Sequence, residues 1–201
     1  MPSVSLTARA HQVLHRHIQP GDFVIDATAG NGHDTLFLAA AVGDTGRVVA
    51  CDLQADALAR TRTALAATQW QNVELLQANH ADLEQLARQQ GWPAPAAIVF
   101  NLGYLPQGDK TIVTRTETTL VALQAAIRLL AAGGLLSVLA YPGHPEGSQE
   151  KETIEIWLPQ LSPSEFHCTV TESPPGRKPG PVLYTVQKQK PSSSRAESHN
   201  P

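Results

Sequence analysis

The sequence predicts an α/β fold of the doubly wound, Rossmann-like type, with a mostly parallel sheet that ends in an antiparallel hairpin. Short apolar segments alternate with helical stretches over residues 23–140, the pattern of parallel strands covered by helices on both faces. A glycine-rich loop follows the first apolar segment, as in nucleotide-binding folds of this class. Near the end, only a stretch rich in proline and glycine separates two strand-like segments, which excludes a helical crossover and favours antiparallel pairing.

The individual elements follow from apolar spacing and from the glycines and prolines that interrupt it. A helix is expected over residues 6–18 and ends at Pro20-Gly21. The predicted strands are residues 23–25, 47–51, 73–76, 96–100 and 135–140, followed by the hairpin strands 166–171 and 182–187. The predicted helices between them are residues 33–41, 55–68, 82–90 and 116–131, and a further helix that opens at Glu150 and Glu152.

Length and composition indicate one globular domain. A chain of 201 residues can build one full core, which we expect over residues 1–187, and the polar residues 188–201 should form a disordered tail with nothing to bury. No apolar run is long enough to span a bilayer and the N-terminus lacks a signal-peptide layout, so we expect a cytoplasmic protein without membrane attachment. The net charge of -3 gives no global attraction for nucleic acid, so RNA binding would require a local basic patch.

Neither a metal site nor a disulfide is expected. The two cysteines, Cys51 and Cys168, lie in apolar runs, and the eight histidines form no ligand-spaced cluster with them. His11, His15 and His17 fall on the first predicted helix, where we expect them at the surface. An exposed apolar face on the same helix would permit a homodimer.

The loop after the first strand is the predicted cofactor site. Gly30 and Gly32 allow a close approach to a ligand, and the helix that starts near His33 directs its positive end at the same space. A Gly-x-Gly pair alone is equally typical of a tight turn. Asp52 ends the second strand, and an acid at this place can accept hydrogen bonds from ribose hydroxyls, which favours the ligand. The cofactor-binding residues expected from these segments are Asp26, Thr28, Gly30, Asn31, Gly32, Asp34, Thr35, Asp52, Leu53 and Gln54, and we also expect His80 and Asn101 to contact the cofactor.

The charge of this loop bears on which cofactor it binds. The spacing Asp26-x-Thr28-x-Gly30-x-Gly32 resembles the acid-x-Gly-x-Gly-x-Gly signature of class I methyltransferases, with Thr28 in place of the first glycine. An acid before the loop would repel a pyrophosphate but suits a ligand that carries a sulfonium and an α-ammonium group. The antiparallel ending agrees, since a dinucleotide-binding domain ends with a parallel strand. We therefore expect S-adenosyl-L-methionine as the cofactor, with a nicotinamide dinucleotide as the alternative. Asp34 is either a further cofactor contact or an acid favoured by the helix dipole.

Two later loops should border the same space, because the C-terminal ends of parallel strands face the ligand. The segment 79–82 follows the third strand, where this fold usually meets the adenine, so His80 is a candidate contact. Asn101 to Pro106 follow the fourth strand and resemble the Asn-Pro-Pro-Tyr loop of amino-group methyltransferases. The resemblance implies that the Asn101 side chain and the Leu102 carbonyl accept hydrogen bonds from the target amine, while Tyr104 packs on the base. A polar turn with a half-buried tyrosine is the alternative.

Three motifs together resemble one family. Residues 26–35 (DATAGNGHDT), 101–110 (NLGYLPQGDK) and 141–147 (YPGHPEG) are similar to the YtqB-type methyltransferases, a family labelled rRNA methylases whose MnmM members act on tRNA. The resemblance runs from about residue 6 to residue 187. It implies N-methylation of 5-aminomethyl-(2-thio)uridine at position 34 of the anticodon, which gives 5-methylaminomethyl-(2-thio)uridine.

Such a substrate suits the remaining candidate residues. A primary amine is mostly protonated at neutral pH, and His144 or Asp109 could take up its proton. The alternative for His144 is a hydrogen bond to Glu146. Tyr104 could stack on the flipped-out base. Further contacts to the anticodon loop are expected from Lys110, Arg115, Tyr141, Arg177 and Lys178, although each basic residue could equally be a solvated charge.

Other functions stay open at this stage. The acceptor could be rRNA or a small-molecule amine, and the near-neutral charge slightly favours the small acceptor. A cofactor-binding module without catalytic activity is a third hypothesis, and a nicotinamide-dependent oxidoreductase is a fourth.

Overall fold

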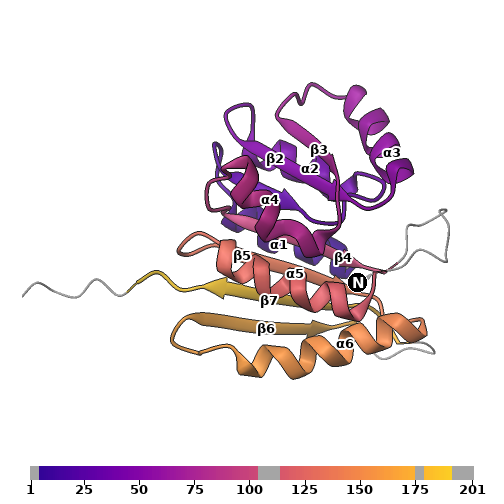
Figure 1. The fold of residues 1–201 in the computed structure, drawn as a ribbon, viewed down its shortest axis with the longest axis vertical. Coiled ribbons are helices and arrows are strands. Elements are labelled where there is room, and N and C mark those ends of the chain that lie inside the picture. The colour runs from indigo at the N-terminus through magenta and orange to yellow at the C-terminus, as the bar shows by residue number, and fades with distance from the viewer. Residues whose placement is uncertain (1–4, 104–113, 175–178, 192–201) are drawn as a thin grey trace, which may run out of the picture.

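The computed structural model describes residues 5–103, 114–174 and 179–191, which form a sheet between two layers of helices (Figure 1). The described strands are β1 (Phe23–Asp26), β2 (Arg47–Asp52), β3 (Val73–Gln77), β4 (Ala97–Leu102), β5 (Leu135–Ala140), β6 (Phe166–Glu172) and β7 (Val182–Lys188). The described helices are α1 (Leu6–His17), α2 (His33–Val42), α3 (Ala55–Ala66), α4 (Leu83–Gln90), α5 (Thr116–Leu129) and α6 (Pro145–Trp157), with short 3₁₀ turns η1 (His80–Asp82) and η2 (Leu158–Gln160).

The sheet confirms the predicted fold class. Its strand order is β3-β2-β1-β4-β5-β7-β6, and the pairs from β3 to β5 are all parallel. β7 pairs antiparallel with β5 on one side and with β6 on the other. β6 therefore runs in the same direction as β5, and β7 alone is reversed. The order reverses between β1 and β4, and open α/β sheets bind ligands at such a point.

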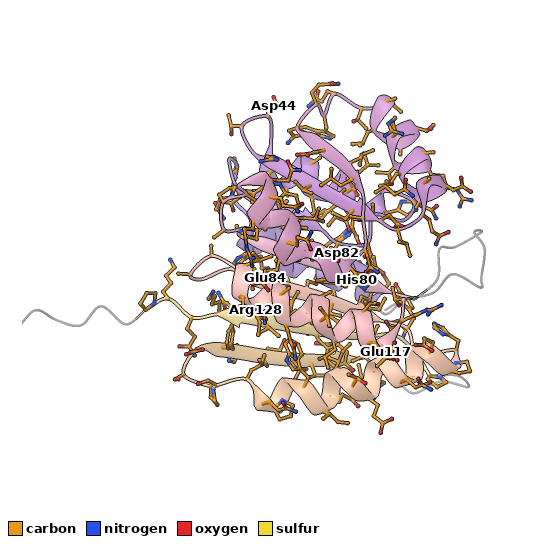
Figure 2. All side chains as sticks on the ribbon, viewed as in Figure 1. Asp44, His80, Asp82, Glu84, Glu117 and Arg128 are labelled. Carbon is orange, nitrogen blue, oxygen red and sulfur yellow. The ribbon has the colours of Figure 1, made fainter. Side chains whose placement is uncertain are left out.

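Alternation of side chains along the strands assigns the helices to two faces. Ile25 and Phe100 pack in one core cluster with residues of α4, α5 and α6. Val24 and Val99, one position earlier on each strand, pack in a second cluster with residues of α1 and α2. Both faces of β1, β4 and β5 are buried, as expected for parallel strands covered on both sides. On the first face, Glu84 of α4 and Arg128 of α5 join the helices through an ion pair of 2.6 Å (Figure 2).

Most predicted boundaries agree within two residues with the structure, and α6 is the exception. The helix begins at Pro145, five residues before the predicted opening at Glu150. Proline suits the first helical position because its missing amide hydrogen has no partner there, and its backbone angle is already helical. His144 precedes it and caps the helix with its side chain. Pro145 is therefore the first residue of the helix.

The first helix corrects two expectations. Its apolar face is packed, since Leu6 and Ala10 are buried against Leu139 of β5 and Leu183 of β7. This face is therefore covered within the chain and is not the exposed apolar surface that would permit a homodimer. The histidines are not all at the surface either: His15 is exposed, but His11 contacts Asp34 of α2, and His17 contacts the carbonyl of Ala96 at 3.1 Å. No helix in the described ranges is long and apolar enough to cross a membrane.

Candidate active site

The carboxyl ends of β1, β2 and β4 open onto one cavity of about 850 Å³. It lies where the strand order reverses, which is the place expected for a ligand. The residues that line the cavity come from segments far apart in sequence, from Thr7 of α1 to Tyr141 after β5. The predicted site residues that line it are Thr28, Gly30, Asn31, Asp34, Asp52, Leu53, Gln54, His80, Asn101, Leu102, Arg115 and Tyr141.

Asp52 is held by backbone amides at the end of β2. Its Oδ2 accepts a hydrogen bond from the amide of Gly30 at 2.9 Å, and its Oδ1 accepts one from the amide of Gln54 at 2.9 Å. Asp52 also lines the cavity, and because a carboxylate can accept about four hydrogen bonds it has capacity for about two more. The carboxylate is thus oriented before any ligand arrives, which suits the recognition of a pair of hydroxyl groups.

The glycine loop is shaped by close packing on α3. Gly32 has a φ of 83°, and a Cβ at this position would lie 3.1 Å from the backbone and side chain of Thr61. Both the backbone angle and the space therefore require glycine. Thr61 also donates its hydroxyl hydrogen to the carbonyl of Gly30 at 3.1 Å, which ties α3 to the loop. Gly32 itself supports the loop and does not line the cavity.

Asp26 and Thr35 also lie behind the cavity wall. The Asp26 carboxyl is fully buried, and it accepts hydrogen bonds from the Thr35 hydroxyl at 2.6 Å and from the Thr28 amide at 3.1 Å. Burial and, secondarily, the charge of Asp34 raise the pKa of Asp26 to about 7. The expectation that the acid before the loop faces a cationic ligand is therefore corrected: its carboxyl points into the protein and braces the loop.

His80 forms part of the wall after β3. It is buried, packs edge-on against Phe100 with ring centroids 5.8 Å apart, and lines the cavity. Desolvation lowers the pKa of His80 to about 4, so the ring is neutral. Its buried Nε2 has no hydrogen-bond partner among the residues that the structure describes. A buried nitrogen of this kind is costly unless a ligand or water pairs with it.

Asn101 stands at the carboxyl end of β4. Its backbone amide donates to Thr28 Oγ1 at 2.7 Å, and its side-chain amide donates to Asp34 Oδ2. Gly103 follows with a φ of 152°, a value that proline cannot adopt. The backbone at Gly103 therefore differs from the one that the second proline of an Asn-Pro-Pro-Tyr loop would impose.

Residues before α5 and after β5 complete the rim. The Thr114 amide donates to the Gly103 carbonyl at 3.0 Å, which joins the residues before α5 to the end of β4. Buried Glu150 of α6 accepts hydrogen bonds from the hydroxyls of Thr114 at 2.8 Å and Thr119 at 2.6 Å. Burial raises the pKa of Glu150. The rim on this side is thus anchored to α6.

His144 has a structural task that sequence reasoning did not assign. Its Nδ1 accepts a hydrogen bond from the Gly147 amide at 3.1 Å and so caps α6. Glu146 instead accepts from the Thr116 amide at 3.2 Å. His144 does not line the cavity. The ring nitrogen that would take up a proton is therefore already engaged, which argues against the predicted role of His144 as proton acceptor.

Several predicted residues lie outside the described residues: Tyr104, Asp109, Lys110, Arg177 and Lys178. Their roles stay predictions. In the described ranges, no group of three or more histidine, cysteine, aspartate or glutamate side chains could hold a metal ion.

Sequence reasoning missed Thr7 and Thr118, which line the cavity, and His11, which contacts Asp34. The position of His11 three residues before Leu14 and seven before Ile18, on the buried stripe of α1, was the available signal.

The fold and the site define a class I methyltransferase. The strand order with β7 reversed, the glycine loop beside an oriented acid, and an asparagine at the end of β4 are combined around one cavity. The chain belongs to the family described as "Putative rRNA methylase", whose model matches residues 48–187. The matched region does not include α1, β1 and α2, and the structure places the loop between β1 and α2 at the cavity.

Individual relatives agree with this assignment. The chain is 40% identical over 171 residues to a chloroplastic tRNA (mnm(5)s(2)U34)-methyltransferase of Arabidopsis thaliana; the match covers 81% of this chain and 62% of the relative. The chain thus spans less than two thirds of the length of that relative. A "putative rRNA-methylase" of Clostridium thermocellum has a similar structure, with a TM-score of 0.88, 34% identity and coverage of 94% and 100% of the two chains. A "putative methyltransferase" of Streptococcus mutans, solved in complex with SAH, has a TM-score of 0.81, 28% identity and coverage of 94% and 99%.

Proposed function

We propose that this chain is an S-adenosyl-L-methionine-dependent N-methyltransferase that acts on RNA. Its proposed acceptor is 5-aminomethyl-(2-thio)uridine at position 34 of tRNA, which it would convert to 5-methylaminomethyl-(2-thio)uridine. One observation carries the proposal: Asp52, which suits a ribose, and Asn101, which suits an amine, line the same cavity. The name of the Arabidopsis relative supports tRNA as the acceptor.

The cavity residues fit the proposed cofactor. The remaining acceptor positions of Asp52 suit the two ribose hydroxyls, and the unpaired Nε2 of His80 suits a hydrogen bond to the adenine. Asn31 lines the cavity beside the glycine loop, and we propose that it contacts the amino-acid part. When bound, S-adenosyl-L-methionine supplies a methyl group on a sulfonium as the electrophile. The S. mutans structure solved with SAH supports this cofactor.

For methyl transfer, the acceptor amine must be neutral and its nitrogen lone pair must point at the methyl group. The ammonium form has no lone pair, so it must lose one proton before nitrogen can attack the methyl carbon. Asn101 would hold the amine through its side-chain oxygen, because its nitrogen already donates to Asp34. Orientation of this kind can account for several kcal/mol of a barrier, on the order of 7–11 in favourable cases. We propose no specific proton acceptor among the described residues, since His144 is engaged in capping α6.

The RNA would approach across the rim. Arg115 and Tyr141 lie at the mouth of the cavity, where a phosphate and a base of the anticodon loop could contact them. We propose that Tyr104, Lys110, Arg177 and Lys178 also contact the anticodon loop. A homodimer also stays a prediction, which sedimentation would test.

The decisive experiment is a methyl-transfer assay on defined tRNA. The purified chain is incubated with labelled S-adenosyl-L-methionine and tRNA that carries 5-aminomethyl-2-thiouridine, and the nucleosides are analysed by mass spectrometry. Label in 5-methylaminomethyl-2-thiouridine is expected, and Asn101→Ala should lower the rate by about 100-fold. Gln71→Ala, at an exposed position away from the cavity, is the matched control. No label at position 34 would overturn the proposal.

Ribosomal RNA is the second candidate acceptor. The description of the family and the name of the C. thermocellum structure favour it. Isolated ribosomal subunits in the same assay distinguish the two acceptors, since only one of the two RNAs should take up label at low enzyme concentration. A small-molecule amine would be indicated if free 5-aminomethyluridine reacted as fast as the tRNA.

A further inference from the structure

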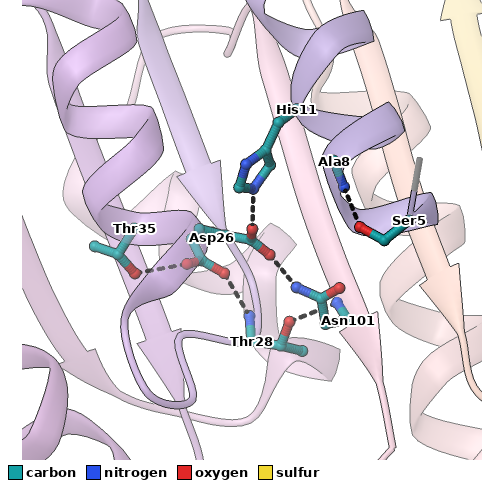
Figure 3. A network of polar contacts seen from close by, with 8 residues as sticks. Ser5, Ala8, His11, Asp26, Thr28, Thr35 and Asn101 are labelled. Atoms are coloured by element: carbon teal, nitrogen blue, oxygen red, sulfur yellow. Dashed lines mark hydrogen bonds and ion pairs between the residues drawn. The ribbon is translucent and has the colours of Figure 1, made fainter. Parts of the chain in front are cut away.

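A line of polar contacts runs from the first helix to the end of β4 (Figure 3). His11 Nε2 of α1 lies 2.5 Å from Oδ1 of Asp34, a residue in the first turn of α2. The other carboxylate oxygen of Asp34 accepts a hydrogen bond from the Asn101 side chain. Asp34 and Asn101 line the cavity, whereas His11 contacts Asp34 from behind. The contacts therefore join α1, α2 and β4 directly behind the proposed acceptor site.

His11 is held rigidly in this position. Its ring stacks on Phe37, with centroids 4.0 Å apart and planes within 3° of each other. Phe37 is three residues after Asp34, so both partners of the ring lie on the same face of α2. The helix that carries His11 is itself packed, with Leu14 fully buried. A half-buried imidazole in such a setting has little freedom to leave Asp34.

The contact with Asp34 determines how the Asn101 amide is turned. An ionised carboxylate can only accept hydrogen bonds, so the nitrogen of the amide must face Asp34 and its oxygen must point elsewhere. The backbone of Asn101 is fixed independently by the hydrogen bond to Thr28. With both ends held, the amide oxygen has one orientation, and it is the only hydrogen-bond acceptor of this side chain.

Resting on the proposed function, we infer that His11 is a positioning residue for methyl transfer. By donating its Nε2 hydrogen to Asp34, it holds the carboxylate that orients Asn101, so that the asparagine oxygen is presented to the acceptor amine. His11 itself touches neither the cofactor nor the amine. Without the histidine donor, Asp34 would be free to rotate about its side-chain bonds, and the amide of Asn101 would lose its fixed direction.

Two substitutions of His11 separate this role from simple packing. His11→Phe keeps a ring to stack on Phe37 but removes the N–H donor. His11→Gln loses the ring but places an amide N–H close to the position of Nε2. His15→Phe, at an exposed position of the same helix, is the matched control. Each variant is assayed for kcat and KM with tRNA carrying 5-aminomethyl-2-thiouridine, for the Kd of S-adenosylhomocysteine by calorimetry, and for Tm.

We expect His11→Phe to lower kcat by about 10- to 100-fold. The Kd of S-adenosylhomocysteine should stay within about twofold of the unsubstituted chain, because the ribose and adenine sides are untouched. His11→Gln should recover most of kcat despite the lost stacking, and His15→Phe should match the unsubstituted chain. A merely structural role predicts the opposite order, with His11→Gln the more damaged variant because it loses the ring.

Three results would overturn the inference. They are a kcat of His11→Phe equal to that of His15→Phe, a His11→Gln variant as slow as His11→Phe, or a loss that appears in the Kd of S-adenosylhomocysteine to the same extent as in kcat. Each of them leaves the proposed function standing, because the unsubstituted chain still transfers methyl groups. No transfer by the unsubstituted chain would instead overturn the proposed function, and this inference with it.

Discussion

The Gly30 amide donates a hydrogen bond to the Asp52 carboxylate at 2.9 Å, although the two residues lie 22 positions apart in the sequence. The contact joins the loop after β1 to the end of β2. A carboxylate that is oriented in advance pays less entropy when it binds a ligand. A substitution of Asp52 should therefore also disturb the glycine loop, because the two are joined by this hydrogen bond.

Replacement of Asp52 by asparagine tests this contact. The neutral amide cannot accept at both of its ends, so it loses either the Gly30 or the Gln54 hydrogen bond along with its charge. We expect affinity for S-adenosyl-L-methionine to fall by about 10- to 100-fold, the range for a hydrogen bond to a charged group. Calorimetry measures it, with Asp56→Asn at an exposed position of α3 as the control. Equal affinity in the two variants would contradict a ligand role for Asp52.

Asp26 should make stability depend on pH. Its pKa is raised from 3.8 to about 7, so the folded state binds the proton more tightly than the unfolded state does. The resulting stabilisation is fully present below pH 3.8 and is lost as pH rises toward about 7, with a slope of at most about 1.4 kcal/mol per pH unit.

Asp26→Asn isolates this contribution, since the amide does not titrate. The unfolding free energy of the unsubstituted chain minus that of the variant should fall as pH rises from 4 toward about 7, and then level off. Urea unfolding at several pH values measures it. A difference that stays constant over this interval would show that the Asp26 carboxyl titrates as it does in the unfolded chain.

Gly32→Ala should destabilise the protein more than Gly91→Ala. Both glycines have a positive φ, of 83° and 61°, so both alanines carry the cost of a left-handed backbone, about 1 kcal/mol. Only at Gly32 does the new Cβ also meet Thr61 at 3.1 Å, because nothing lies within 4 Å at Gly91. We expect a lower Tm for Gly32→Ala and a weaker cofactor complex. Equal Tm values would mean that α3 moves away at little cost.

His144→Ala should remove the cap of α6. Loss of an N-cap acceptor costs about 1 kcal/mol, and His144→Asn should restore it because asparagine is among the best N-cap residues. Chemical unfolding of the two variants checks the prediction. Methyl transfer should follow the same order. If His144→Asn were stable but inactive, the imidazole would have a chemical role that capping does not explain.

Much of the fold could be predicted because its signals are local. Apolar spacing located the strands of the parallel half and their helices, and the proline-rich stretch before Val182 excluded a crossover helix. The predicted start of α6 at Glu150 was wrong, because the helix begins five residues earlier with Pro145 as its first residue. The direction in which each side chain of the site points was harder to predict from the sequence. Asp26 turns inward because its hydroxyl partner, Thr35, lies on the next helix, and no spacing rule reports such a contact.

By itself, the sequence determined the class of fold, the loop that carries the two glycines and the strand ends at which Asp52 and Asn101 stand. Apolar periodicity and the backbone freedom of glycine act over a few residues, so they can be inferred from neighbours along the chain. Tertiary structure alone decided that β7 lies between β5 and β6, that His11 contacts Asp34, and that His144 caps a helix. Burial and hydrogen-bond partners depend on segments brought together from distant parts of the chain, and those contacts exist only in the folded protein.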